Sequence, residues 1–161
     1  MATAEGRRSI EVDMKRIWGV MSAMTLISSG AMAQSRAVTH IDSEKVAAAL
    51  SGGSRGIVGP LVATKDYTVS GIKRVSAGQV EIHDHETDIF YITDGEAMFV
   101  TGGTIVGAKQ SAPGQTRGTD LHGGNTVRLK KGDVVTIPAG VPHWFKDVSP
   151  SISYLTVKVI K

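Results

Sequence analysis

The sequence contains no cysteine among its 161 residues, so disulfide bonds and thiolate chemistry are excluded. Any metal site must therefore be built from nitrogen and oxygen ligands. Aromatic residues make up only 5% of the chain, which leaves no visible platform of rings for stacking against sugars. The net charge is +3, but the Lys and Arg residues are scattered, and this distribution argues against nucleic-acid binding.

The sequence also lacks an apolar run long and clean enough for a membrane span. The nearest approach is residues 17–31, which follow two basic residues and are interrupted by polar ones. Ala31-Met32-Ala33 then gives the small-x-small pattern of a signal cleavage site. We expect residues 1–33 to be a cleaved signal peptide, with Met14 as an alternative start, and the mature protein to be secreted or periplasmic without membrane attachment. The alternative is an N-terminal core helix.

Glycine is abundant, at 19 residues, and apolar residues alternate with polar ones over much of the chain. Residues 34–66 are expected to form an N-terminal arm with one short helix over 44–50, capped by Asp42 or Ser43. Residues 67–161 predict an all-β domain of about nine short strands, of the sandwich or barrel type.

Three connections between these strands are marked by polar and turn-forming residues. Glu86-Thr87 is predicted to be a turn, and Asp94-Gly95 has the composition of a hairpin turn. Residues 107–124 are polar, Gly-rich and aperiodic. A loop of this length usually binds something or stays mobile.

The strongest chemical signal is a set of three histidines. His83 and His85 are two residues apart, and on a strand such residues point to the same face. Their imidazoles would then project side by side into one cavity. His143 closes a separate segment, 132–143, whose pattern is G-x5-P-x-G-x2-H.

Over residues 67–159 these segments resemble the two motifs of the cupin family. The matching residues of the first motif are Gly78, His83, His85, Asp88 and Gly95, and those of the second are Gly132, Pro138, Gly140 and His143. The resemblance implies a cupin double-stranded β-barrel (jelly roll), with one metal ion held inside on His83, His85 and His143. It also implies a homodimer.

The carboxylate of the first motif departs from the family pattern. Asp88 stands where the family has Glu, and it follows His85 after two residues instead of three or four. We expect Asp88 to be a weak ligand, a partner of a ligand or a proton carrier, with Glu86 as the other candidate or an exposed turn residue. His122 in the long loop is either a fourth ligand and substrate contact or a solvated residue. His40 is expected at the surface.

Strand parity also predicts the walls of the cavity. Phe90, Ile92 and Phe145 share the parity of the presumed ligands and should line it, either as an apolar wall around the ion or simply as barrel core. Tyr91 and Trp144 should point outward.

Three imidazoles without a firm carboxylate favour copper, which is bound most tightly by nitrogen sites, with zinc, manganese or iron as alternatives. The chain is also similar to compact exported copper cupins that cleave cellulose oxidatively. The leading hypothesis is therefore a secreted copper-dependent oxidoreductase, acting on a polysaccharide or another carbohydrate or small molecule. The alternatives are a non-redox isomerase or lyase, in which Asp88 or a nearby tyrosine acts as acid or base, and a binding module without turnover.

Overall fold

The computed structural model describes residues 38–52 and 60–161. The expected signal peptide, residues 1–33, lies outside these ranges. The described residues contain no helix that is long and apolar enough to cross a membrane.

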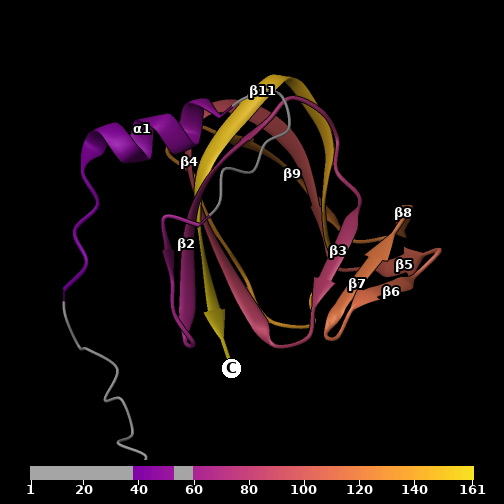
Figure 1. The fold of residues 1–161 in the computed structure, drawn as a ribbon. Coiled ribbons are helices and arrows are strands. Elements are labelled where there is room, and N and C mark those ends of the chain that lie inside the picture. The colour runs from indigo at the N-terminus through magenta and orange to yellow at the C-terminus, as the bar shows by residue number, and fades with distance from the viewer. Residues whose placement is uncertain (1–37, 53–59) are drawn as a thin grey trace, which may run out of the picture. The chain divides into compact units, whose positions relative to one another are not determined.

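One short helix precedes eleven strands in the described chain, and all belong to one unit, Val38–Lys161 (Figure 1). The elements are α1 (Ser43–Ser51), β1 (Val62–Ala63), β2 (Tyr67–Arg74), β3 (Val80–His83), β4 (Glu86–Thr101), β5 (Thr104–Val106), β6 (Lys109–Ala112), β7 (Gln115–Gly118), β8 (Asp120–His122), β9 (Asn125–Lys130), β10 (Val134–Ile137) and β11 (His143–Ile160). The all-β class and the single short helix are as the sequence predicted.

Two long antiparallel strands, β4 and β11, organise the barrel, pairing from His143 opposite Thr101 to Ile160 opposite Glu86. On its free side β4 pairs with β10 near its start and with β9 near its end. β11 likewise pairs with β3 at its start and with β2 along its second half. Register shifts in the middle of the pair bend it, so β2 and β3 lie on opposite sides of the barrel (Figure 1).

Gly95 lies at this bend, and the predicted hairpin at Asp94-Gly95 is wrong. β4 runs straight through the glycine, which pairs with Ile152 of β11 and has a φ of 72°. A Cβ at this position would collide with the carbonyl oxygen of Ser151. The glycine therefore allows two bent strands to approach closely. In the sequence, such a position has the same local composition as a turn.

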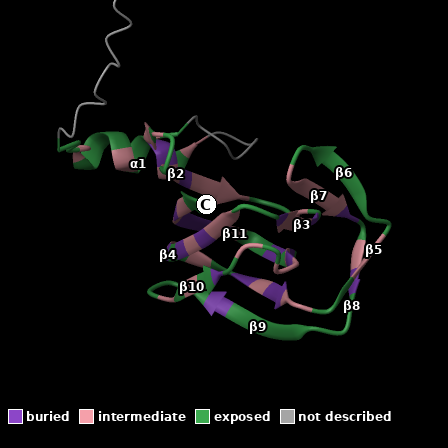
Figure 2. Cartoon of the chain, turned by 90° about the horizontal axis from the view of Figure 1, so that it is seen from below, coloured by how far each residue is buried: buried purple, intermediate pink, exposed green. Residues whose placement is uncertain are grey.

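The core fills the space between the two halves of the bent sheet. Its main cluster contains four aromatic rings in mutual contact, with centroids 4.7 Å apart for Phe99 and Phe145 and 4.9 Å apart for Phe90 and Tyr154. Figure 2 shows the buried residues gathered along β4 and β11, whereas β6 is exposed along its length. The rings come from both halves of β4 and β11, so their packing holds the barrel closed.

The outward residues also follow the predicted parity. Tyr91 is 49% exposed. Trp144 packs on a second, smaller core cluster of Val80, Val100 and Leu121, and its Nε1 donates a hydrogen bond to the Gly78 carbonyl at 2.8 Å.

The predicted loop over 107–124 is wrong in large part. It contains β6, β7 and β8, and β8 pairs with β5 in a separate two-stranded sheet. Its residues have little apolar periodicity because β6 is exposed on both faces. The segment therefore forms strands through backbone pairing rather than through burial.

α1 begins with a side-chain cap and packs on the outside of the sheet. The Asp42 Oδ1 atom accepts a hydrogen bond from the backbone N–H of Lys45 at 2.8 Å. Ala49, which is 2% exposed, faces Gly71 of β2, where a Cβ would come within 2.7 Å of the Ala49 Cβ. The helix thus depends on a glycine beneath it and on its cap.

Asp42→Ala should lower the free energy of unfolding, because a first-turn N–H loses its acceptor. Chemical denaturation measures this loss. Asp42→Asn keeps an acceptor oxygen and should change stability much less. Equal losses in both variants would contradict the capping role.

Candidate metal centre

The centre is built on the pairing of β3 with β7. In this register His83 lies opposite Gln115, and Glu81 lies opposite Arg117. Directly opposed residues share a face of the sheet, so the four side chains point into the barrel together. His143, the first residue of β11, pairs with Glu81 from the other side of β3. A row across three strands therefore brings His143, Glu81 and Arg117 together.

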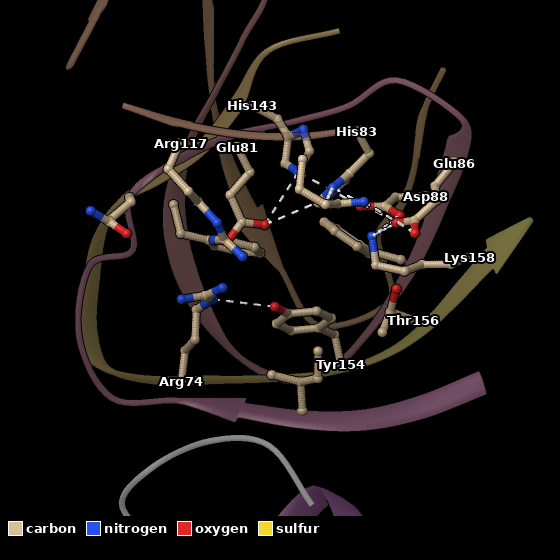
Figure 3. A pocket seen from close by; sticks show the side chains of 15 residues that line it. Arg74, Glu81, His83, Glu86, Asp88, Arg117, His143, Tyr154, Thr156 and Lys158 are labelled. Atoms are coloured by element: carbon tan, nitrogen blue, oxygen red, sulfur yellow. Dashed lines mark hydrogen bonds and ion pairs between the residues drawn. The ribbon is translucent and has the colours of Figure 1, made fainter. Parts of the chain in front are cut away.

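The opposite wall comes from β4 and β11, where Asp88 lies directly opposite Lys158. The Lys158 ammonium donates hydrogen bonds to Asp88 Oδ1 at 2.7 Å and to Glu86 Oε2 at 2.9 Å. Asp88 is only 2% exposed, so its charge is offset by a partner fixed by strand register. Figure 3 shows this acidic side of the cavity beside His83.

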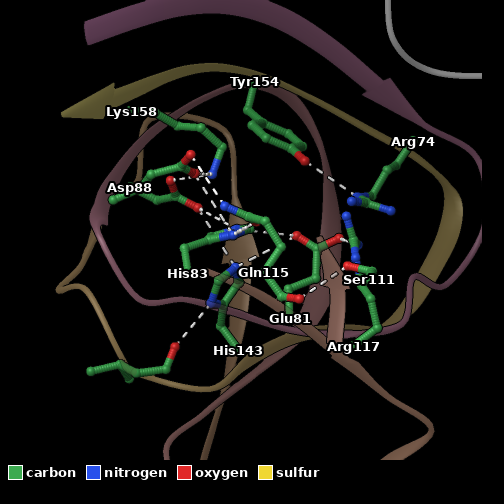
Figure 4. A network of polar contacts seen from close by, with 12 residues as sticks. Arg74, Glu81, His83, Asp88, Ser111, Gln115, Arg117, His143, Tyr154 and Lys158 are labelled. Atoms are coloured by element: carbon green, nitrogen blue, oxygen red, sulfur yellow. Dashed lines mark hydrogen bonds and ion pairs between the residues drawn. The ribbon is translucent and has the colours of Figure 1, made fainter. Parts of the chain in front are cut away.

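Hydrogen bonds fix the orientation of both imidazoles. The Nδ1 of His143 lies 3.1 Å from the Val141 carbonyl oxygen, which can only accept, so Nδ1 carries the proton. The Nδ1 of His83 bonds to the side-chain oxygen of Gln115, whose amide nitrogen donates to Glu86 Oε1 at 3.2 Å. In both rings Nδ1 is therefore engaged, and Nε2 is the nitrogen that faces the cavity and would bind a cation in place of a proton. Figure 4 shows these contacts around the two rings.

Four donor atoms converge in front of these rings. Both Nε2 atoms are buried without a hydrogen-bond partner among the described residues. The Oε2 of Glu81 is 3.5 Å from the Nε2 of His83 and 3.8 Å from that of His143. The Oδ2 of Asp88 is 3.5 Å and 3.6 Å from the same two atoms. Ligand atoms at about 2.1 Å from a tetrahedral ion lie roughly 3.4 Å apart, so the spacing of each oxygen from the two nitrogens fits a shared cation. The candidate ligand groups are Glu81 with both histidines, and Asp88 with His83 and Glu86.

In each carboxylate, one oxygen contacts a positively charged side chain and the other faces the two histidines. Glu81 turns Oε1 to Arg117 and Oε2 to the histidines. Asp88 turns Oδ1 to Lys158 and Oδ2 to the histidines. Such outer contacts hold ligands in place before an ion arrives. The residues therefore fit a single transition-metal ion with a nitrogen and oxygen donor set.

The pKa shifts of Glu81, His83 and His143 follow from burial and from the charges around them. Burial opposes ionisation of Glu81, but His83, Arg117 and His143 outweigh it and lower the pKa of this carboxyl to about 2. Burial lowers the pKa of His143, which keeps that ring neutral. Burial also disfavours the charged form of His83, yet the nearby carboxylates raise the pKa of its ring overall. A bound cation would replace that proton.

Two of the three histidines predicted as ligands meet in this cluster, and the third lies outside it. The expectation that His83 and His85 project from one strand is wrong, because β3 ends at His83 and His85 sits on an exposed bend. The chain bends at Asp84 and His85, between the end of β3 and the start of β4. The predicted turn at Glu86-Thr87 is also wrong, as β4 begins at Glu86.

Of the other predicted residues, some contact the cluster and others lie away from it. Asp88 faces the cluster, and Glu86 touches it through Lys158 and Gln115. His122 ends β8 with a side chain 75% exposed, and its Nε2 lies 4.0 Å from the Asp120 Oδ2. His40 is exposed, as expected. The structure therefore does not bring His122 to the cavity that the two histidines face.

The cavity in front of the cluster has a volume of about 280 Å³. Phe90 and Phe145 line it, as predicted, whereas Ile92 is buried in the core behind it. Eight polar residues that line it were missed from the sequence: Arg74, Gln79, Glu81, Gln115, Arg117, Tyr154, Thr156 and Lys158. The signal for Glu81 was available, because it lies two residues before His83 just as His85 lies two after it.

Gln115→Leu should weaken metal binding about 10–100-fold, because the His83 ring loses the acceptor that fixes its Nδ1–H. Titration calorimetry with Mn(II) or Zn(II) measures the affinity. Gln110→Leu is the matched control, since Gln110 is exposed on β6. Equal affinity in the two variants would show that Gln115 does not orient the ring.

The barrel and its inward cluster of two histidines and two carboxylates define a class: β-barrel proteins with a single metal site. A family model described as Cupin matches residues 69–159, which is more than half of the chain. The chain therefore belongs to the cupin family. Cupins bind a metal, and the cluster described above is the candidate site for it in this chain.

Two solved structures with TM-scores above 0.5 agree on the fold. A Bacillus halodurans protein matches with a TM-score of 0.54 at 13% identity, over 76% of this chain and 81% of its own. A Klebsiella pneumoniae protein described as having a double-stranded β-helix domain matches with a TM-score of 0.51 at 19% identity, over 76% and 91%. A predicted oxalate decarboxylase from Thermotoga maritima is 21% identical over 58% and 66%, with a TM-score of 0.41. No curated protein sequence matches the chain.

Proposed function

We propose that the chain is a mononuclear metal-dependent oxidoreductase that acts on a small molecule inside its barrel. The observation that carries this proposal is the pair of buried, unpartnered Nε2 atoms of His83 and His143, each within 3.8 Å of a Glu81 and an Asp88 oxygen. A buried imidazole nitrogen without a partner is costly to leave unpaired. Two such atoms facing two carboxylates suit a cation and little else.

The ligand atoms available in the cluster indicate which metal ion to propose. The preference for copper assumed three imidazoles, whereas the cluster offers two imidazoles and two carboxylates. Two histidines with a carboxylate are typical of Fe(II) oxygenases, and carboxylate oxygens also suit manganese. We therefore place iron or manganese ahead of copper and zinc. When bound, such an ion would supply electron transfer and Lewis acidity.

The surrounding residues have definite tasks in this proposal. Phe90 and Phe145 form an apolar wall that limits water beside the reacting groups. Lys158 holds Asp88 in its ligand orientation through Oδ1. Glu86, which is less buried than Asp88, bonds the same ammonium. Glu86 and Lys158 thus connect the buried Asp88 to the rim, and a proton can enter or leave along them.

The cavity volume favours a small molecule over a polymer. At about 280 Å³, the cavity is near the lower limit of small-molecule sites, which start at about 300 Å³. A single small carbohydrate or organic molecule suits this space, and a cellulose chain does not.

Export and self-association are further parts of the proposal. The signal-like segment 1–33 supports secretion or a periplasmic location, and the family resemblance supports a homodimer. Val134 and Tyr91 are neighbours across β10 and β4, and they are 64% and 49% exposed. This outward apolar pair is available to a second copy. Sedimentation of Tyr91→Ser tests it, with a shift from dimer to monomer as the expected result.

Single-metal reconstitution tests the proposed chemistry. Metal-free protein is loaded separately with Fe(II), Mn(II), Cu(II) or Zn(II), and oxygen uptake is followed with a panel of small hydroxylated and carboxylated molecules. We expect one ion to bind per chain, and substrate-dependent oxygen uptake with iron or manganese. His83→Ala should abolish it, and His122→Ala should not.

Three outcomes would contradict the proposal. Turnover that continues with zinc under argon would indicate an isomerase or lyase instead. Tight binding of ions or ligands without any turnover would indicate a binding module. Uptake that requires copper alone would restore the copper hypothesis and reject the preference for iron or manganese.

A further inference from the structure

One end of the cavity holds two side chains, Arg74 and Tyr154, with donors for which the described residues supply no acceptor. Arg74 lines the cavity from β2, with its guanidinium carbon 4.9 Å from the centre of the Phe145 ring. Its Nε donates to the Tyr154 hydroxyl at 3.2 Å. Unlike Arg117, Arg74 makes no ion pair among the residues that the structure describes. Among the described residues its terminal nitrogens have no hydrogen-bond partner, and they can donate to a ligand in the cavity.

Tyr154 supplies a second free donor at the same place. The side chain is 1% exposed, and its oxygen already accepts from Arg74. Burial raises the pKa of this hydroxyl, so it keeps its proton. No acceptor for that proton is present within residues 38–52 and 60–161. A buried donor of this kind indicates a missing acceptor.

With a divalent ion in the cluster, the charges around the cavity would favour an anionic occupant. The cations are Arg74, Arg117 and Lys158, and the carboxylates are Glu81, Glu86 and Asp88. These formal charges cancel, so a divalent ion in the cluster would leave an excess of two positive charges. A small dianion would offset that excess.

The walls between the two ends indicate what kind of anion fits. Ile72 and Phe145 line the cavity beside Arg74, and Phe90 lines it beside His143. Figure 3 shows Arg74 and Tyr154 on one side of the cavity, and Asp88 and Lys158 on another. A ligand spanning these positions would have a short carbon skeleton between polar ends.

We propose that the substrate is a small carboxylic acid, whose carboxylate binds Arg74 and the Tyr154 hydroxyl while its other end reaches the His83 and His143 cluster. A guanidinium fork binds planar carboxylates through two parallel hydrogen bonds. The hydroxyl adds a third donor from the side. The assignment of this acid as the substrate rests on the proposed function, whereas the anion site itself does not require a bound metal.

Titration calorimetry of malonate and succinate on the full protein tests the anion site. It is run on metal-free protein in EDTA, and separately on the Mn(II)-loaded protein. We expect binding of at least one diacid in both states. Arg74→Gln should weaken it about 10–100-fold, the usual range for a hydrogen bond to a charged group. Arg74→Lys should lie between, because it keeps the charge and loses the fork.

Two further variants keep the test decisive. Tyr154→Phe removes only the hydroxyl and should weaken binding severalfold even if Arg74→Gln does not fold. Arg128→Gln is the matched control, since Arg128 pairs with Glu96 on the outer surface and is 63% exposed. It should bind the diacids as the unchanged protein does.

The possible results separate this inference from the proposed function. Equal affinity of the unchanged protein and Arg74→Gln, or equal binding of neutral malonamide, would overturn the carboxylate site. Tighter binding of inorganic phosphate than of either diacid would overturn the choice of a carboxylate. Diacid binding through Arg74 without any metal binding would reject the metal-dependent function and leave the anion site standing.

Discussion

His143→Ala should lower metal affinity by more than 100-fold. The imidazole is one of two neutral nitrogen donors in the cluster, and its loss leaves the Glu81 and Asp88 oxygens without the Nε2 atom that lies 3.8 Å and 3.6 Å from them. Removing an outer partner of a metal ligand already costs about 10–100-fold, so removing a ligand should cost more. Calorimetry with Mn(II), together with metal analysis after dialysis, measures the loss.

His85→Ala is the control for His143→Ala, because the sequence predicted His85 as a ligand just as it predicted His83. Its affinity should equal that of the unchanged protein, since the side chain is exposed on the bend after β3. An equally large loss in His85→Ala would mean that the ion sits elsewhere. Glu81→Ala should resemble His143→Ala rather than His85→Ala.

Phe99→Ala should lower the free energy of unfolding by about 3–5 kcal/mol, the range for removing a large buried aromatic side chain. Phe99 is fully buried, with ring centroids 4.7 Å from Phe145 and 6.2 Å from His143. The cavity that the variant leaves would also loosen His143, so metal affinity should fall together with stability. Denaturation with and without Mn(II) measures both effects.

The comparison variant is Val75→Ala, at a side chain that is 49% exposed just after β2. It should change stability by no more than about 0.5 kcal/mol, as is usual for surface positions. A loss in Phe99→Ala that is no larger than this would contradict the packed aromatic core.

The presence of most strands was accessible from the sequence, because apolar and polar residues alternate in segments such as β2. Their order in the sheet was not predicted. The α1 helix and its Asp42 cap were also predictable from local composition. Elements that depend on distant partners were not. β6 has no buried face, and the glycine of β4 serves the bend against β11, so neither has a local signal that separates a strand from a turn.

The residues around His83 also show that a local pattern cannot predict contacts that depend on distant strands. Glu81 and His85 are both two residues from His83, so alternation alone cannot choose between them. The choice depends on where β3 ends, and that is fixed by its pairing with β7. Counted from His83, Asp88 follows after four residues, which is the family spacing that His85 failed to give. The shifted register therefore removes the departure in spacing, whereas Asp still stands where the family has Glu.

The polar partners of the ligands could not be predicted at all from single strands. Gln115, Arg117 and Lys158 reach the centre because of cross-strand registers that join residues 32, 36 and 70 positions apart. Their own segments show no motif. His143, by contrast, was recognisable because the turn before it has a Pro and Gly pattern of its own.

The most direct test of the account is a count of imidazole ligands. Pulsed electron spin resonance of the Cu(II)-loaded protein resolves the remote nitrogens of coordinated histidines, whether or not copper is the native ion. The account predicts two such nitrogens in the unchanged protein and in His85→Ala, and one in His143→Ala. Three nitrogens, with one lost in His85→Ala, would contradict it.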